Sequence, residues 1–84
     1  MIRDADTERF INACIGPRIV AGRYFDHYWG DEYTVLAIDR NPPNHMLWSI
    51  TEATDTELAA GTSRTHCTAW DERDRVISQP QKVA

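Results

Sequence analysis

This sequence contains few cysteines, almost no lysine and no long apolar run. Its mean hydropathy is −0.53, and without a long apolar run we expect no membrane-spanning segment and no membrane partner. Its two cysteines, Cys14 and Cys67, are too few for a disulfide scaffold and form no C-x-x-C pair. We therefore expect two reduced, largely buried thiols, with a single Cys14–Cys67 bridge as the alternative.

The first ten residues, MIRDADTERF, lack the apolar segment of a secretory signal. Together with reduced thiols, this predicts a cytoplasmic location. The chain begins with Met1 and ends in polar residues. We therefore expect a complete small protein of the size of a bacterial or phage accessory protein.

Length and charge exclude several classes of protein. Eighty-four residues make room for one domain over residues 1–84, which excludes a two-domain enzyme, a doubly wound nucleotide-binding fold and a repeat array. The chain has 9 basic and 13 acidic residues, a net charge of −4. A basic footprint over the whole domain is therefore absent, which argues against bulk nucleic-acid binding.

The N-terminal residues predict an amphipathic helix over residues 4–15. Asp4 and Asp6 suit a helix start because carboxylates cap free backbone amides there. The apolar residues that follow recur at helical spacing on one face. Gly16 and Pro17 predict the end of the helix, since glycine suits the C-terminal cap and proline cannot continue the hydrogen-bond ladder.

Five short strands are expected after this helix. Residues 19–29 are rich in aromatic and β-branched side chains, and Gly22 within them indicates a bulge or a sharp bend. After a turn at Gly30 and Asp31 come residues 33–38, which are apolar on both faces over their second half and are expected to form the most buried strand. The other strands are expected over residues 46–51, 65–70 and 76–77. A capping box at Thr54 and Glu57 predicts one or two helical turns before Gly61.

This order of elements predicts a mainly β fold of the α+β class. One helix before five strands cannot form a doubly wound sheet, which needs a helix between strand pairs. Closing a short meander into a barrel removes its exposed edges. We therefore expect a five-stranded SH3-like small barrel over residues 18–78. The helix 4–15 would cover one end of the barrel, and a flexible tail would follow over residues 79–84.

The first hairpin carries a resemblance to a known family. Its glycine, tyrosine, histidine–aromatic and Val-Leu positions are Gly22, Tyr24, His27, Tyr28, Gly30, Tyr33, Val35 and Leu36. In this pattern it resembles short bacterial SH3-like domains of unknown function. This chain has one extra residue between Tyr24 and His27, and Trp29 stands where the family usually has lysine. The resemblance implies a fold and no activity.

The same hairpin is the candidate binding surface. Its predicted ligand-binding residues are Tyr24, Tyr28, Trp29, Asp31 and Tyr33. Aromatic grooves bind proline-rich peptides or methylated side chains, and the acids Asp26, Asp31 and Glu32 would favour a basic ligand. The alternative is that these aromatics fill the core. The leading hypothesis is a non-enzymatic interaction module that binds a protein or peptide.

Two other functions remain open. Clustered arginines could bind nucleic acid, with tyrosines between them for base stacking; the candidates are Arg18, Arg23, Arg40, Arg64 and Arg75. A homo-oligomeric structural or accessory protein could instead bury the apolar surplus at a subunit interface.

We expect no catalytic residue, no metal and no cofactor. His66 and Cys67 are neighbours on a predicted strand, so they would point to opposite faces and could not bind one zinc ion together. The same argument separates Asp26 from His27. Neither cysteine is accompanied by a glycine-rich elbow or an oxyanion loop. The acids of residues 71–74 are expected to form a solvated, locally paired turn.

Overall fold

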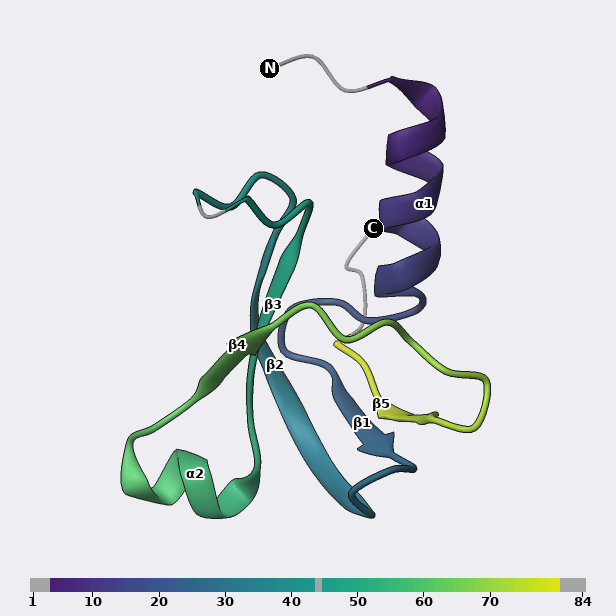
Figure 1. Cartoon of the computed structure of the whole chain (residues 1–84). Coiled ribbons are helices and arrows are strands. Elements are labelled where there is room, and N and C mark those ends of the chain that lie inside the picture. Colours follow the sequence, from purple (N-terminus) through teal and green to yellow (C-terminus); the bar gives the residue numbers. More distant parts are fainter. Residues whose placement is uncertain (1–3, 44, 81–84) are drawn as a thin grey trace.

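The computed structural model describes residues 4–43 and 45–80. Its elements, in chain order, are α1 (Ala5–Ile15), β1 (Arg23–Asp26), β2 (Asp31–Asp39), β3 (Ser49–Ala53), α2 (Asp55–Ala60), β4 (Arg64–His66) and β5 (Arg75–Ser78) (Figure 1). Neither of these helices has the length and apolar character that crossing a membrane requires.

The five strands form one antiparallel sheet in the order β4-β3-β2-β1-β5. This confirms the α+β class with a short N-terminal helix before five strands. The sheet is open, because β4 and β5 lie at its two edges and do not pair with each other. Closure into a barrel, which the strand count favoured, is not seen in the described residues.

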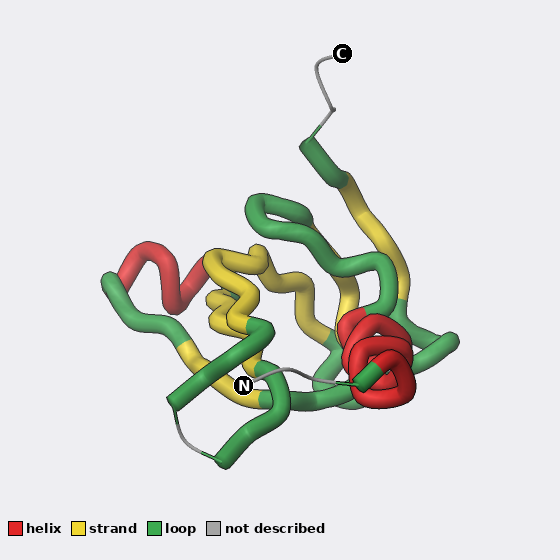
Figure 2. Tube along the Cα trace, turned by 90° about the horizontal axis from the view of Figure 1, so that it is seen from above, coloured by secondary structure: helices red, strands yellow, loops and turns green. Residues whose placement is uncertain are grey.

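Helix α1 lies beside the sheet, nearly end-on in Figure 2. The Asp4 side chain accepts a hydrogen bond from Thr7 N at 2.7 Å, which is the cap expected at this end. Gly16 ends the helix with a φ of 62°. Ile11 and Ile15 are the buried side chains of α1.

The core lies at one end of one face of the sheet. Ile11 and Ile15 of α1 pack on this face, which is the inner face of the sheet. The core consists of Ile11, Ile15, Tyr24, Tyr33, Val35, Trp48 and Ile50. Side chains on a strand alternate between faces, so Glu52 shares a face with buried Ile50, and Asp26 with buried Tyr24. Along β1 and β3 the inner face therefore changes from apolar to charged. Away from the core, this face therefore carries charged side chains.

Three expectations about burial and strand length are wrong. Residues 33–38 are not covered on both faces: Val35 is fully buried, whereas Leu36 is 41% exposed and faces solvent. A register shift between Val35 and Ala37 also breaks the alternation there. Strand β4 ends at His66 rather than Trp70, and Cys67 is exposed instead of buried. Both cysteines are free.

The sharp bend predicted near Gly22 is present. Gly22 N donates to Ile19 O at 3.1 Å, and Ala21 has a φ of 70°. The glycine itself is needed for space, since a Cβ there would lie 2.6 Å from Cζ of Tyr24. The buried Tyr24 hydroxyl in turn accepts a hydrogen bond from Ile19 N at 2.8 Å.

Gly22→Ala is therefore expected to lower the free energy of unfolding by about 3 kcal/mol, because it forces the Tyr24 ring out of its place. The matched control is Gly30→Ala, where no atom lies within 4 Å of the added Cβ. It should cost only about 1 kcal/mol for its left-handed backbone. Urea unfolding followed by circular dichroism measures both. Equal losses would show that crowding at Tyr24 is unimportant.

Candidate functional site

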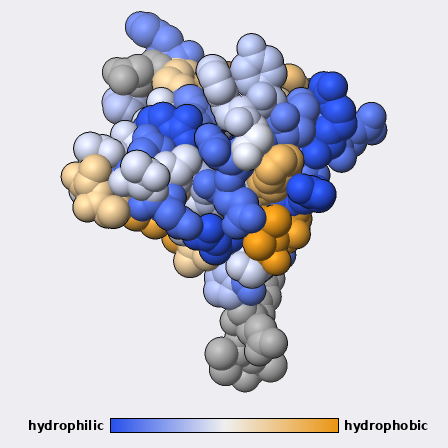
Figure 3. Space-filling model, turned by 90° about the horizontal axis from the view of Figure 1, so that it is seen from below, coloured by the Kyte–Doolittle hydropathy of each residue, from blue (hydrophilic) through white to orange (hydrophobic). Residues whose placement is uncertain are grey.

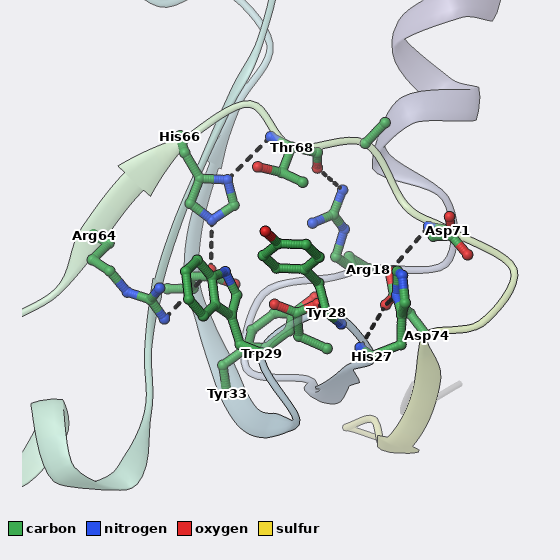
Figure 4. Close-up of a pocket in the computed structure, with 13 residues that line it drawn as sticks. Arg18, His27, Tyr28, Trp29, Tyr33, Arg64, His66, Thr68, Asp71 and Asp74 are labelled. Carbon is green, nitrogen blue, oxygen red and sulfur yellow. Dashed lines mark hydrogen bonds and ion pairs between the residues drawn. The ribbon is translucent and has the colours of Figure 1, made fainter.

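A pocket of about 420 Å³ lies at the charged end of the inner sheet face. Strand β4 supplies one wall with Arg64 and His66, and the chain from Thr68 to Asp74 crosses to the opposite side (Figure 4). The β1–β2 turn contributes Tyr28 and Trp29. The pocket is thus built from segments that are far apart in the sequence.

The rim carries the two most exposed aromatic side chains described. Tyr28 is 76% exposed and Trp29 is 69% exposed. Their rings meet edge to face with 5.0 Å between centroids. The turn is held by a hydrogen bond from Tyr28 N to the Asp26 carboxylate at 3.0 Å and by Gly30 N donating to Asp26 O at 2.8 Å. These aromatics are therefore presented to solvent on an ordered turn.

One wall contains a buried carboxylate–histidine pair. The Glu52 Oε1 atom lies 2.5 Å from Nε2 of His66. His66 Nδ1 accepts a hydrogen bond from Thr68 N at 3.1 Å, so the proton of the neutral imidazole is on Nε2 and is donated to Glu52. Arg64 lies 3.7 Å from the same carboxylate oxygen. Glu52 is 6% exposed, and its Oε2 atom has no hydrogen-bond partner among the described residues.

The opposite side contains a second pair, His27 and Asp74. Nδ1 of His27 lies 2.6 Å from the Asp74 carboxylate, which also accepts from the backbone N–H groups of His27 and Asp71, both at 3.0 Å. Burial alone would raise the pKa of Asp74. The hydrogen bonds from His27 and Asp71 outweigh burial and hold that pKa below its ordinary value. Asp74 therefore joins the hairpin to the loop before β5.

Arg18 and Tyr33 line the pocket from the side of the core. Arg18 is 4% exposed. Burial raises the pKa of Tyr33 to about 12, against the opposing influence of the Arg18 guanidinium. The Tyr33 hydroxyl thus stays protonated at neutral pH.

Asp26, His27 and Asp74 form the one group of possible metal ligands found in residues 4–43 and 45–80, with ligand atoms within 4.8 Å of one another. The expected separation of Asp26 from His27 is wrong, because β1 ends at Asp26 and His27 lies in the turn. The Asp74 carboxylate is already occupied by three hydrogen bonds. The donors present therefore suit a hydrogen-bonded link better than an ion.

A second hollow of about 330 Å³ continues the first. The two share Asp26, Trp29, Tyr33 and Arg64, so they form one groove. Six carboxylates line it, against two guanidinium groups: Asp26, Asp31, Glu52, Glu57, Asp71 and Asp74 against Arg18 and Arg64. Arg64 already pairs with Glu57 at 3.1 Å. The groove is therefore electronegative.

The structure separates the five residues predicted for ligand binding. Tyr28, Trp29 and Tyr33 line the first pocket, and Asp31 lines the second hollow with Trp29 and Tyr33. Tyr24 is fully buried in the core and lines neither. Tyr33 is only 5% exposed, so it contributes to the pocket from beneath.

The predicted arginines have separate partners. Arg18 is buried, and Arg23 is held by Asp55 at 2.9 Å and by Glu32 at 3.2 Å. Arg40 donates to Asn12 at 2.6 Å. The Arg75 guanidinium lies 4.4 Å from the centre of the Phe25 ring. Arg64 is the remaining member and faces Glu52 and Glu57.

Glu52, His66 and Asp74 were not predicted as site residues. Glu52 had a signal in the sequence: it continues the alternation of the core residues Trp48 and Ile50, which places a carboxylate on the buried face. No signal in the sequence pointed to Asp74, because its partner His27 is distant in the chain. The acidic turn at 71–74 is only partly as expected. Asp71 pairs with Arg73 at 3.0 Å, whereas Asp74 turns inward to His27.

Comparison with protein-family models, with curated proteins and with solved structures finds no match for this chain. The function is therefore argued from the groove alone.

Proposed function

We propose that this chain is a non-enzymatic interaction module that binds a protein or peptide segment by taking one basic side chain into the groove beside Tyr28 and Trp29. The observation that carries the proposal is the position of this exposed aromatic pair at the mouth of an acid-lined groove. An aromatic face attracts a cation by about 0.5–2 kcal/mol, and nearby carboxylates strengthen the attraction.

The surroundings of the groove support a ligand recognised by charge rather than by a broad apolar contact. Seen from below, the molecule exposes mainly hydrophilic residues, with hydrophobic ones in small separate groups (Figure 3). Carboxylates outnumber guanidinium groups along the groove, which disfavours a phosphate backbone as the ligand. The resemblance to SH3-like small barrels stays a prediction. The proposal does not depend on it, since the groove lies on an open sheet.

The test compares wild-type protein with Trp29→Ala by nuclear magnetic resonance. The probe is a capped Gly-Ala-Lys-Ala-Gly peptide, with the glutamate version as the charge control. We expect saturable shifts of the His66 and Thr68 amide signals with the lysine peptide only. Trp29→Ala should weaken binding about tenfold, since it removes the exposed cation–π partner. Its melting temperature should stay close to wild type because Trp29 is largely exposed.

Phe10→Ala is the matched control, since Phe10 is an exposed aromatic residue on α1, is 55% exposed and does not line the groove. It should bind the lysine peptide as wild type does. If the wild-type protein shows no shift with up to about 10 mM lysine peptide, where even millimolar affinity would be detected, the proposal is wrong.

A further inference from the structure

The unpartnered oxygen of Glu52 is the least satisfied polar atom of the groove. Glu52 lies on β3, and its side chain is 7% exposed. Oε1 is used by His66 and approached by Arg64, whereas Oε2 is buried without a hydrogen bond from any described residue. Leaving such an atom unpaired costs about 1–3 kcal/mol, and more for a charged group. The described residues therefore satisfy this carboxylate only in part.

The described residues around Glu52 do not supply a donor for Oε2. His66 cannot supply this donor, because its Nδ1 atom accepts from Thr68 N and its Nε2 atom already donates to Oε1. What the pocket lacks is a hydrogen-bond donor that arrives from outside.

We propose that the side chain bound in this groove is a cation that carries N–H groups, an unmethylated lysine ammonium or an arginine guanidinium, and that it donates a hydrogen bond to the Glu52 carboxylate, which lines the pocket. This inference rests on the proposed function and names its ligand class. A charged N–H donor forms a short bond to a buried carboxylate and neutralises it. A trimethylated ammonium has the same charge but no donor, so it cannot form this hydrogen bond, and its positive centre stays further from the carboxylate.

The experiment titrates the capped Gly-Ala-Lys-Ala-Gly peptide and its trimethyllysine counterpart into wild-type protein and into Glu52→Gln. Glutamine keeps the oxygen that accepts from His66 and replaces the other oxygen by a donor. We expect trimethyllysine to bind wild type at least tenfold more weakly than lysine. Glu52→Gln should lose at least tenfold for lysine and much less for trimethyllysine.

Asp71→Asn is the matched control, because it removes one negative charge from the same pocket at a half-exposed position. It should weaken lysine binding no more than threefold, and thermal melts establish that both variants are folded. Equal losses from Glu52→Gln and Asp71→Asn, or equal affinity for lysine and trimethyllysine, would overturn the inference while leaving the proposed function intact. Absence of lysine binding to wild type would overturn both.

Discussion

Arg18→Ala is expected to lower the free energy of unfolding by about 3 kcal/mol or more, a large share of the stability of so small a domain. The guanidinium donates to three backbone carbonyls, at Ile15 (3.0 Å), Cys14 (2.9 Å) and Thr68 (2.8 Å). It thereby caps the negative end of α1 and attaches the helix to the chain after β4. Alanine would leave the Thr68 carbonyl without its donor, while Cys14 O keeps its hydrogen bond from Trp70 N at 2.7 Å and Ile15 O its longer one from the backbone N of residue 18 at 3.4 Å.

Aromatic contacts add to the expected loss. The Arg18 guanidinium lies 5.6 Å from the centre of the Trp48 ring and 5.9 Å from that of Trp70. Removing it leaves a cavity between the two rings as well as an unpaired carbonyl at Thr68. Arg18→Lys should recover only part of the stability, because an ammonium cannot reproduce the planar fork of donors or the stacking.

Urea unfolding followed by far-ultraviolet circular dichroism measures the effect of Arg18→Ala. Arg40→Ala is the control, since Arg40 is exposed and bonded only to the Asn12 side chain in the described structure. It should change the free energy of unfolding by no more than about 0.5 kcal/mol. A loss below about 1 kcal/mol for Arg18→Ala would mean that water replaces the guanidinium without penalty.

Asp74→Ala is expected to cost about 2–4 kcal/mol at neutral pH. Its carboxylate accepts hydrogen bonds from the His27 ring and from the backbone N–H groups of His27 and Asp71. Alanine would leave these donors in a half-buried site without an acceptor. The variant should also loosen the β1–β2 turn, because Asp74 is its link to the loop before β5.

The cost of Asp74→Ala should depend on pH. Since the folded pKa of Asp74 is lowered, the carboxylate stabilises the fold fully above its ordinary pKa of about 4, and this contribution is lost as the pH falls through the lowered value. The difference between wild type and variant should therefore narrow from about pH 5 toward pH 2. Other carboxylates with lowered pKa values titrate in both proteins and cancel.

Glu72→Ala is the control for this series, because Glu72 is an exposed acid of the same loop. It should change the free energy of unfolding at neutral pH by no more than about 0.5 kcal/mol. A difference between wild type and Asp74→Ala that stays constant from pH 7 to pH 2 would assign the effect to packing instead of to the ionised carboxylate.

Local patterns in the sequence predicted most of the elements. The N-terminal helix agrees with the structure within one residue at its start. The capping box at Thr54 and Glu57 is present with both of its hydrogen bonds, and Gly61 ends that helix in a left-handed conformation. These features depend on residues within one turn of one another, so neighbours in the sequence contain the whole signal.

The groove depends on contacts that local patterns do not encode. His27 meets Asp74 only because β1 and β5 pair, and Arg18 meets Thr68 only because the chain after β4 returns to α1. Burial of Leu36 was overestimated for a similar reason: nothing in residues 33–38 says how many layers cover a sheet. The aromatic hairpin was predicted as a candidate surface together with its own acids Asp26 and Asp31. The more distant acids Glu52, Glu57, Asp71 and Asp74 could not be placed beside it.

The order of the strands in the sheet affects the order in which they pair during folding. The last strand, β5, pairs with the first, β1, and about fifty residues separate them. Closing so long a loop costs conformational entropy before the native contacts form. We therefore expect this pairing to form late in folding. On the ribosome, α1 and the strands β1 to β4 emerge before β5 does. We therefore expect the loop that carries Asp71 and Asp74 to become ordered only when β5 pairs with β1, which makes the groove the last part of the fold to form.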